Sequence, residues 1–330
     1  MNQMEKVFEV KNLKKHFPVK KPLFSGKRLF NKAVDGVSFD LFEGETLSIV
    51  GESGSGKSTV GRCVVRLIDP TDGNIYYKGS DITKLSHAKL RRMRSEFQMI
   101  FQDPFASLNP RMTIGSAISE PIIASGAASG KEAMDRTFSM LEKVGLDPEY
   151  YYRYPHQFSG GQRQRVGIAR ALVLNPKVII ADEAVSALDV SVQAQIINLL
   201  KDIQTEFNLT YMFIAHDLSV VKYLSDRIAV MYLGEIMELS DKNSLFENPL
   251  QPYTQALISA IPKPNPRAKG NKIILTGDIP SPINPPSGCK FHNRCFKRLD
   301  RCDEDVPQVY KVGNRLVKCH LYAGTERADD

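Results

Sequence analysis

The stretch Gly51-Glu-Ser-Gly-Ser-Gly-Lys57-Ser58-Thr59 decides the fold of this 330-residue chain. It follows the apolar run Leu47–Val50 and leads into Val60–Ile68, which can continue as a helix. The pattern Gly-x-x-x-x-Gly-Lys-Ser between a strand and a helix predicts a loop that binds phosphate. A chance match in a turn rich in glycine and serine is the alternative, and the motifs found farther along the chain decide between the two.

The residue types in this loop suit the chemistry of a nucleotide phosphate. Gly54 and Gly56 allow the backbone to curl so that its N–H groups point toward phosphate oxygens, and the helix N-terminus adds partial positive charge. Lys57 is expected to reach the β- and γ-phosphates, and the Ser58 hydroxyl is expected to ligate Mg²⁺. The predicted phosphate site consists of Gly51, Ser53, Gly54, Ser55, Gly56, Lys57, Ser58 and Thr59.

The bulk composition indicates a globular chain without a membrane span. No apolar run approaches the roughly 18 residues that a spanning helix requires. The start of the chain, Met1–Phe8, lacks the apolar core of a signal peptide, so we expect a cytosolic protein. The formal net charge of +7 could suit nucleic acid or an anionic membrane, but scattered surface charge explains it equally well.

Alternating strand and helix patterns predict an α/β fold. The residues Phe105–Pro155 carry helical pattern and no clear strand, so we interpret them as a helical insertion, whereas Pro18–Lys32 is predicted to be an exposed loop. Strands are predicted at Val7–Val10, Ala33–Leu41, Asn74–Tyr77, Phe97–Phe101, Lys177–Ala181 and Thr210–Ala215, with a hairpin over Ile228–Leu239, and helices at Ser86–Arg94, Ser159–Leu174, Ser191–Phe207, Leu218–Leu224 and Tyr253–Ile261.

An acid pair follows one of the apolar strands, at Asp182-Glu183. Asp182 can lie beside Mg²⁺, opposite Ser58, and Glu183 can activate a water molecule against the γ-phosphate. An acid pair at a strand end is weak support when taken alone, because many strands end in acids. Phe158-Ser-Gly-Gly-Gln162 opens the next predicted anion site, where Ser159 and two glycines start a helix.

The segment Phe158–Ala171 resembles the signature motif of ATP-binding cassette (ABC) ATPases, with Phe158 where leucine is commoner. Gln102 matches the family's Q-loop, Ser186–Asp189 its D-loop and His216 its switch histidine. The resemblance covers about Val7–Leu239 with all motifs in the family's order, which makes coincidence untenable. It implies a P-loop NTPase (RecA-like) core with an antiparallel β subdomain and a helical subdomain, and it implies hydrolysis of ATP with Mg²⁺.

The resemblance also assigns roles to individual residues. Glu183, His216 and Gln102 are the implied catalytic residues, and Ser58, Gln102 and Asp182 are the implied Mg²⁺ ligands. Phe17 stands where the family stacks an aromatic ring on adenine, although packing in the core is the alternative. In the family two subunits pair head to tail, so Ser159 and Gly161 would contact the γ-phosphate held by a partner chain. Gly160, Gln162 and Asp189 are further residues that the resemblance implies for nucleotide binding. Ala184 departs from the family, which usually has proline there.

Motifs in the last third of the chain resemble the ATPase subunits of bacterial oligopeptide/dipeptide permeases. They are Asn248–Leu257, Ala260–Pro264, Asp278–Pro282 and Pro285–Cys295, and His216–Asp226 resembles the F-type subunit. The resemblance implies an ABC domain at 5–245, with its helical subdomain at about 104–170, and an oligopeptide-transporter-type extension at 246–330.

That resemblance implies a peripheral subunit on the cytoplasmic face of the cell membrane. Its partners would be a related D-type ATPase chain, two transmembrane permease subunits and an extracytoplasmic substrate-binding protein, with no nucleic acid. A nickel importer of the same family is one alternative for the cargo. A cytosolic ABC ATPase that acts outside transport is another, but such proteins usually have tandem cassettes or long coiled-coil insertions.

Four of the five cysteines, Cys289, Cys295, Cys302 and Cys319, fall near the C-terminus. Structural disulfides are not expected in the cytosol, and the spacing lacks the Cys-x₂-Cys knuckle of a zinc ribbon. Four thiolates suit an iron–sulfur cluster, and the family resemblance implies a [4Fe–4S] cluster. Zinc and free thiols remain as alternatives. Cys63, alone on the helix after the phosphate loop, is predicted to be a small core residue.

Overall fold

A computed structural model describes residues 5–19, 28–103, 107–262 and 272–328. The chain forms two compact units. The first unit contains Leu41–Thr46 and Lys84–Ala215, and the second contains Lys6–Asp40, Leu47–Thr83 and the chain from His216 onward. The second unit therefore combines residues from both ends of the sequence, and it holds the phosphate loop together with the C-terminal cysteines.

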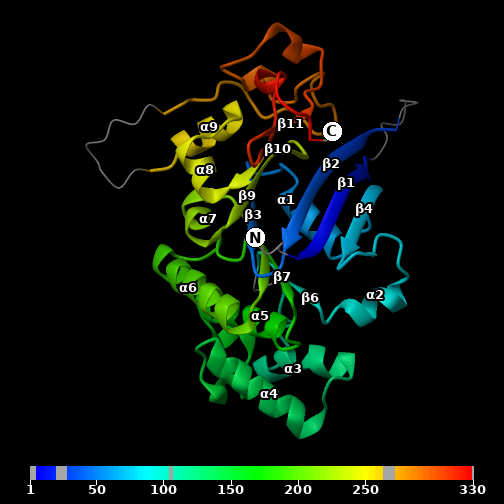
Figure 1. Ribbon diagram of the computed structural model, residues 1–330. Helices are drawn as coiled ribbons and strands as arrows, with labels where there is room; N and C mark the ends of the chain where they lie inside the picture. Colours follow the sequence, from blue (N-terminus) through cyan, green and yellow to red (C-terminus); the bar gives the residue numbers. More distant parts are fainter. Residues whose placement is uncertain (1–4, 20–27, 104–106, 263–271, 329–330) are drawn as a thin grey trace. The chain divides into compact units, whose positions relative to one another are not determined.

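One sheet of the second unit is antiparallel, as the family resemblance implied (Figure 1). Its strands are β1 (Lys6–Pro18), β2 (Phe30–Phe42), β4 (Asp72–Tyr77) and β5 (Ser80–Asp81), in the order β2-β1-β4-β5. Phe8 of β1 pairs with Tyr77 of β4, and their rings lie 5.0 Å apart. The predicted strand at Asn74–Tyr77 is confirmed. The predicted loop Pro18–Lys32 lies partly outside the described residues, and β2 begins within it, at Phe30.

The other strands of the second unit carry the phosphate loop. They are β3 (Thr46–Val50), β9 (Arg227–Tyr232), β10 (Glu235–Asp241), β11 (Val309–Val312) and β12 (Arg315–Lys318), in the order β11-β12-β10-β9-β3. Strand β3 runs parallel to β9, and the predicted hairpin of β9 and β10 is confirmed. Glu238 of β10 pairs with Val317 of β12, so C-terminal residues extend this sheet. The sequence patterns did not predict β11 or β12.

Short helices complete the second unit. They are α1 (Lys57–Val64), α7 (Leu218–Leu224), α8 (Lys242–Glu247), α9 (Pro252–Ser259) and three 3₁₀ turns, η3 (His292–Arg294), η4 (Asp300–Asp303) and η5 (His320–Tyr322). The Glu238 carboxylate, fully buried, accepts hydrogen bonds from the N–H groups of Leu250 and Gln251 at 3.0 and 2.9 Å. The Gln251 side chain in turn caps α9, so α9 is fixed to β10.

The first unit combines a parallel sheet with the predicted helical insertion. Strands β6 (Phe97–Ile100), β7 (Val178–Asp182) and β8 (Thr210–Ala215) are hydrogen-bonded in that order, and β7 and β8 are entirely buried. The helices are α2 (His87–Met93), α3 (Ile114–Ser125), α4 (Gly130–Lys143), α5 (Gly160–Leu172) and α6 (Val190–Phe207), with the 3₁₀ turns η1 (Pro148–Tyr152) and η2 (Pro155–Gln157). Within residues 107–155 the described backbone contains helices and turns without a strand, which confirms the predicted helical character.

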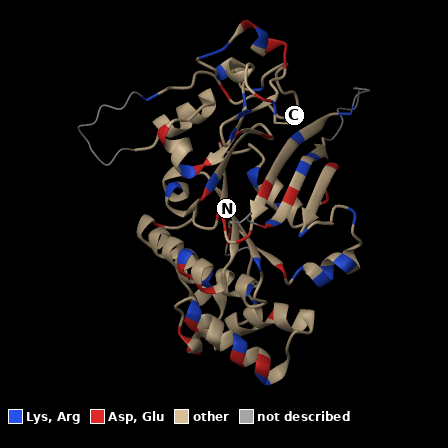
Figure 2. Cartoon of the chain, in the orientation of Figure 1, with Lys and Arg blue, Asp and Glu red and all other residues tan. Residues whose placement is uncertain are grey.

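Surface charge identifies no single partner. Figure 2 shows basic and acidic residues mixed along β1, β2 and α4, so the net charge of +7 is spread over many elements. Among the described residues, no helix combines the length and the apolar character that crossing a membrane requires.

Candidate functional site

The phosphate loop is shaped by two close approaches of backbone to backbone. A Cβ atom on Gly51 would lie 2.2 Å from the carbonyl oxygen of Met231, and one on Gly56 would lie 2.0 Å from that of Ala33. Both glycines also have positive φ angles, of 153° and 100°. A side chain fits at neither position, because the backbones of β9 and β2 come too close. Gly51 and Gly56 therefore have to be glycine, as the motif requires.

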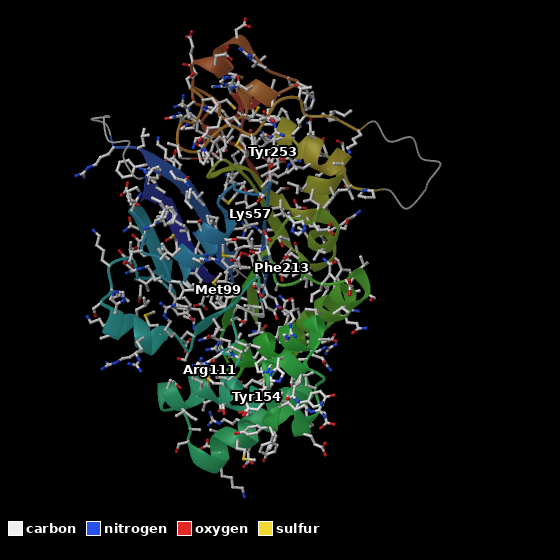
Figure 3. The ribbon with its side chains drawn as sticks, turned by 180° about the vertical axis from the view of Figure 1, so that it is seen from behind. Lys57, Met99, Arg111, Tyr154, Phe213 and Tyr253 are labelled. Carbon is white, nitrogen blue, oxygen red and sulfur yellow. The ribbon has the colours of Figure 1, made fainter. Side chains whose placement is uncertain are left out.

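Lys57, labelled in Figure 3, reaches back from the end of this loop to its start. Its buried ammonium group donates hydrogen bonds to the carbonyl oxygens of Gly51 at 2.9 Å and Glu52 at 3.1 Å. Gly56 is the N-cap of α1, so the helix starts at Lys57, with the half-buried Ser58 and Thr59 in its first turn. The structure thus gathers the predicted loop residues at one helix N-terminus, while phosphate binding by them stays a prediction.

Two residues that the sequence patterns did not identify hold the loop at Glu52. The Tyr253 hydroxyl accepts a hydrogen bond from the Glu52 N–H at 3.0 Å. The two terminal nitrogens of Arg294 donate to the two oxygens of the Glu52 carboxylate, at 2.7 and 3.0 Å. These residues are 201 and 242 positions from Glu52 in the chain, so no local signal could have revealed them.

Phe17, the predicted adenine-stacking residue, lies near the end of β1 and is half-buried. The Lys15 ammonium is 5.0 Å from its ring centre, and the neighbouring His16 contacts the Asp35 carboxylate at 3.1 Å. Burial alone would raise the pKa of Asp35, but hydrogen bonds from Lys290 and His16 outweigh it and lower that pKa. The ring is thus outside the fully buried core, and its contact with adenine stays a prediction.

The first unit brings together two of the predicted catalytic residues. Strand β7 ends at the fully buried Asp182, and Glu183 follows in a left-handed conformation with φ of 47°. The Gln102 amide donates a hydrogen bond to the Glu183 carboxylate at 2.7 Å. Because β6 and β7 are parallel neighbours, their carboxyl ends lie at the same edge of the sheet, and this explains the contact.

The signature and D-loop segments are also neighbours within the first unit. Ser159 is the N-cap of α5 and forms a capping box with Gln162, with hydrogen bonds of 3.3 and 3.0 Å. A Cβ atom on Gly161 would lie 2.4 Å from Cγ1 of Val192, in the first turn of α6. Asp189 is the N-cap of α6, so the start of α5 packs against the start of α6. Ser159 and Gly160 are exposed.

The predicted site residues are divided between the two units. The phosphate loop, Phe17 and His216 belong to the second unit, and His216 is exposed just after β8. Gln102, Asp182, Glu183 and the signature residues belong to the first. A joint site formed from both groups stays a prediction.

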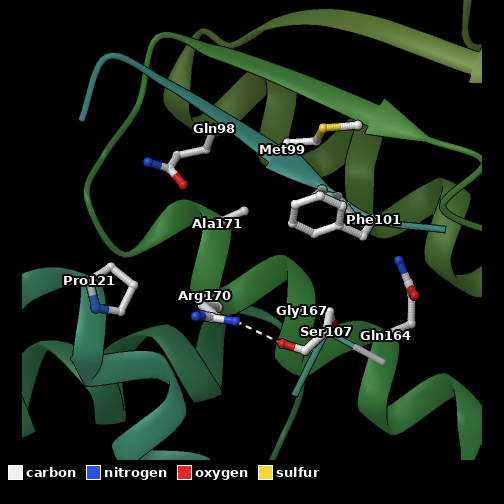
Figure 4. A pocket seen from close by; sticks show the side chains of 10 residues that line it. Gln98, Met99, Phe101, Ser107, Pro121, Gln164, Gly167, Arg170 and Ala171 are labelled. Atoms are coloured by element: carbon white, nitrogen blue, oxygen red, sulfur yellow. Dashed lines mark hydrogen bonds between the residues drawn. The ribbon is translucent and has the colours of Figure 1, made fainter. Parts of the chain in front are cut away.

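A hollow of about 170 Å³ lies within the first unit, between β6, α3 and α5 (Figure 4). Phe101, the residue before Gln102, lines it and is 40% exposed. Arg170 crosses it from α5 and donates to the carbonyl oxygen of Ser107 at 2.8 Å. Gln164 also lines the hollow, and its buried amide nitrogen has no hydrogen-bond partner within the described part of the chain.

The four C-terminal cysteines are free thiols, and Cys289, Cys302 and Cys319 are buried. Burial raises the pKa of Cys289 to about 12, and the nearby thiols of Cys302, Cys319 and Cys295 add to the rise. Burial also raises the pKa of Cys319 to about 11. The described residues nevertheless contain no group of three or more His, Cys, Asp or Glu side chains arranged to hold a metal ion. The predicted iron–sulfur ligands are thus near one another without forming a ready-made site.

Cys63, predicted to be a core residue, is fully buried in α1. Burial raises the pKa of its thiol to about 11. The prediction is confirmed.

Comparison with known proteins matches two family models. Residues 34–186 match the model described as ABC transporter, and residues 237–302 match the model described as oligopeptide/dipeptide transporter, C-terminal region. The oligopeptide transport ATP-binding protein AppF of Bacillus subtilis is 55% identical, over 97% of this chain and 98% of that protein. The dipeptide transport ATP-binding protein DppF of Escherichia coli is 50% identical, over 93% of this chain and 92% of that protein.

Among solved structures, the chain is similar to the ATP-binding cassette MJ0796, in a dimeric post-hydrolysis state bound to ADP and Pi. That chain is 32% identical with a TM-score of 0.63, over 71% of this chain and 98% of that one. The cbiO1 protein of Clostridium perfringens, part of the transporter complex cbiONQ, is 26% identical with a TM-score of 0.62, over 74% of this chain and 92% of that one.

The contact between Gly161 and Val192 yields a stability prediction. Gly161→Ala should lower the free energy of unfolding by about 1–3 kcal/mol, because the new methyl group overlaps the Val192 side chain. The double variant Gly161→Ala/Val192→Ala should recover much of the loss, since it removes the overlapping atoms. Urea unfolding measures both, and Gly167→Ala is a matched control because a Cβ there meets nothing within 4 Å. Equal losses in the single and double variants would show that the contact is not the cause.

Proposed function

The chain belongs to the ATP-binding proteins of bacterial oligopeptide/dipeptide ABC transporters, and from that premise we propose that it is the subunit whose ATP hydrolysis drives peptide import. The structural observation that carries the proposal is the phosphate loop at the end of β3, with Lys57 held across its inner side. Relatives named for peptide transport match along nearly the whole chain, including the C-terminal region, and this favours peptide as the cargo class.

Each predicted site residue would have its own role in ATP hydrolysis. Lys57 and the N-terminus of α1 would neutralise the phosphates, and Ser58, Asp182 and Gln102 offer the oxygen ligands that Mg²⁺ prefers. Bound Mg²⁺ would supply further positive charge at the phosphates. Glu183 would accept a proton from the attacking water, and His216 would contact the γ-phosphate. Because Gln102 is hydrogen-bonded to Glu183, a movement of Gln102 would change the position of the proposed base.

We propose that the working site needs a second ATPase chain, a related D-type subunit. The similarity to a cassette solved as a dimer supports this. The exposed N-terminus of α5 supports it too, because Ser159 and Gly160 are available to nucleotide held by another chain. The packing of Gly161 on α6 would position this motif together with Asp189.

The remaining proposed partners are two transmembrane permease subunits and an extracytoplasmic substrate-binding protein, which would select the cargo. The chain would then lie at the cytoplasmic face of the membrane. The hollow between β6, α3 and α5 supports a contact with the permease, because Phe101 joins it directly to Gln102. A permease segment seated there would contact the exposed Phe101 ring and could thereby move the neighbouring Gln102 side chain.

For the C-terminal cysteines we propose a [4Fe–4S] cluster with Cys289, Cys295, Cys302 and Cys319 as ligands. The donor set suits a cluster, since four thiols gather without forming a disulfide. The thiols do not form a group that would hold a metal ion as they stand, so the backbone that carries them would have to adjust when the cluster binds.

Glu183→Gln tests the role of the proposed base. The variant should still bind ATP but hydrolyse it about 10²–10⁴-fold more slowly, because the amide cannot take up the proton. Nucleotide retained after gel filtration and phosphate release in the steady state measure the two properties. Glu247→Gln, an exposed carboxylate on α8, is the matched control and should leave both unchanged. Unchanged phosphate release by Glu183→Gln would remove this residue from the mechanism.

Anaerobic purification tests the cysteine proposal. The protein should be coloured and should contain iron and acid-labile sulfide in equal amounts, and replacing the four C-terminal cysteines by serine should abolish both. Cys63→Ser should retain them, because Cys63 lies on α1 and is not one of the proposed ligands. A colourless protein that contains zinc or no metal would refute the cluster.

A further inference from the structure

We propose that Arg294 is a positioning residue for the nucleotide site: through Glu52 it fixes the first turn of the phosphate loop and neutralises the negative charge there. The C-terminal region would then set the affinity for MgATP as well as extend the sheet. This inference rests on the proposed function for the identity of the ligand, and the contacts that carry it all lie within the second unit.

The ion pair between Arg294 and Glu52 is bidentate and largely shielded from water. The Arg294 side chain is 8% exposed and the Glu52 side chain 25%. Both terminal nitrogens of the guanidinium donate to the carboxylate, in the fork geometry that makes such pairs directional. The guanidinium also lies 5.8 Å from the centre of the Tyr232 ring. These contacts leave Arg294 few alternative positions.

Glu52 uses each of its polar groups to connect the loop with a different element. Its carboxylate binds Arg294, its N–H donates to Tyr253 of α9, and its carbonyl oxygen accepts from Lys57. Arg294 therefore acts on the residue that also holds the lysine expected to bind phosphate. A change at Arg294 can reach Lys57 through one intervening residue.

A second contact from the same segment supports the other side of the loop. Lys290 donates to the Asp35 carboxylate at 2.8 Å and to the carbonyl oxygen of Leu233 at 3.1 Å. Gly234, which follows Leu233, donates its N–H to the carbonyl oxygen of Ser55 in the phosphate loop at 2.9 Å.

Phe291 lies between Lys290 and Arg294 in the sequence. Its buried ring packs on the rings of Tyr232 and Tyr253, and the ring centres are 5.3 Å apart in each case. The segment Lys290–Arg294 thus holds the loop from two sides.

The charge of Glu52 gives Arg294 a role beyond stability. An unpaired carboxylate in the first turn of a phosphate loop would repel the triphosphate, and repulsion in a half-buried setting is stronger than in water. Arg294 cancels that charge without placing a cation in the loop itself. A neutral residue at position 52 would need no such partner, so the two side chains should be coupled in their effect on MgATP.

A double-mutant cycle on the full chain tests this coupling through the dissociation constant for MgATP, measured by titration calorimetry. Arg294→Ala should weaken binding about tenfold, whereas Arg294→Ala/Glu52→Gln should bind within about threefold of the wild type, because the unpaired charge is gone. The dissociation constant of Arg294→Lys should lie between those of the wild type and Arg294→Ala, since lysine keeps the positive charge but cannot donate two parallel hydrogen bonds to the carboxylate. In steady-state assays Arg294→Ala should raise KM more than it lowers kcat.

Arg298→Ala is the matched control, because Arg298 forms an exposed ion pair with Asp303 in the same region and should leave binding unchanged. Thermal unfolding of every variant separates a change in folding from a change in affinity. Unchanged affinity in Arg294→Ala, or a double variant as weak as that single one, would overturn the proposal. If Arg294→Ala does not fold, Arg294→Lys with and without Glu52→Gln provides the same comparison. A wild-type chain that bound no MgATP would instead contradict the proposed function.

Discussion

The structure of the nucleotide site depends on the close packing of the phosphate loop against two strands. The carbonyl oxygens of Met231 and Ala33 come so near to Gly51 and Gly56 that any side chain would collide with them. This constraint bends the backbone into a curve that Lys57 can cross, and it starts α1 at the same point. The conformation of the predicted phosphate loop is thereby fixed by backbone contacts rather than by flexible side chains.

Two acidic residues near the phosphate loop are paired with cations. Glu52 and Asp35 both lie close to it, and each is paired with a cation from the C-terminal region, Arg294 and Lys290 respectively. The same region adds β12 to the sheet beside β10. The C-terminal residues are therefore part of the framework around the loop, and Cys289 and Cys295 flank the segment Lys290–Arg294 that provides both cations.

How much could be predicted from the sequence depended on how local each signal was. The glycine loop, the acid pair at the end of β7 and the signature motif at α5 are short patterns of neighbouring residues, and the strands and helices that carry them were predicted correctly. Tyr253 and Arg294 could not be found this way, because each contacts Glu52 from more than 200 positions away in the chain. In addition, no local pattern separates a buried arginine from one at the surface. Strands β11 and β12 were missed because they are only four residues long and polar residues interrupt their apolar pattern.

The central claim, that this chain supplies the ATP hydrolysis of a peptide importer, is tested most directly by reconstitution. The chain would be combined with its partner ATPase and permease subunits in proteoliposomes, and phosphate release would be measured with and without peptide-loaded binding protein. The account predicts that the loaded binding protein raises hydrolysis and that Lys57→Ala in this chain abolishes the rise. A rate of phosphate release that does not respond to the loaded binding protein, or whose response is unchanged by Lys57→Ala, would contradict the account.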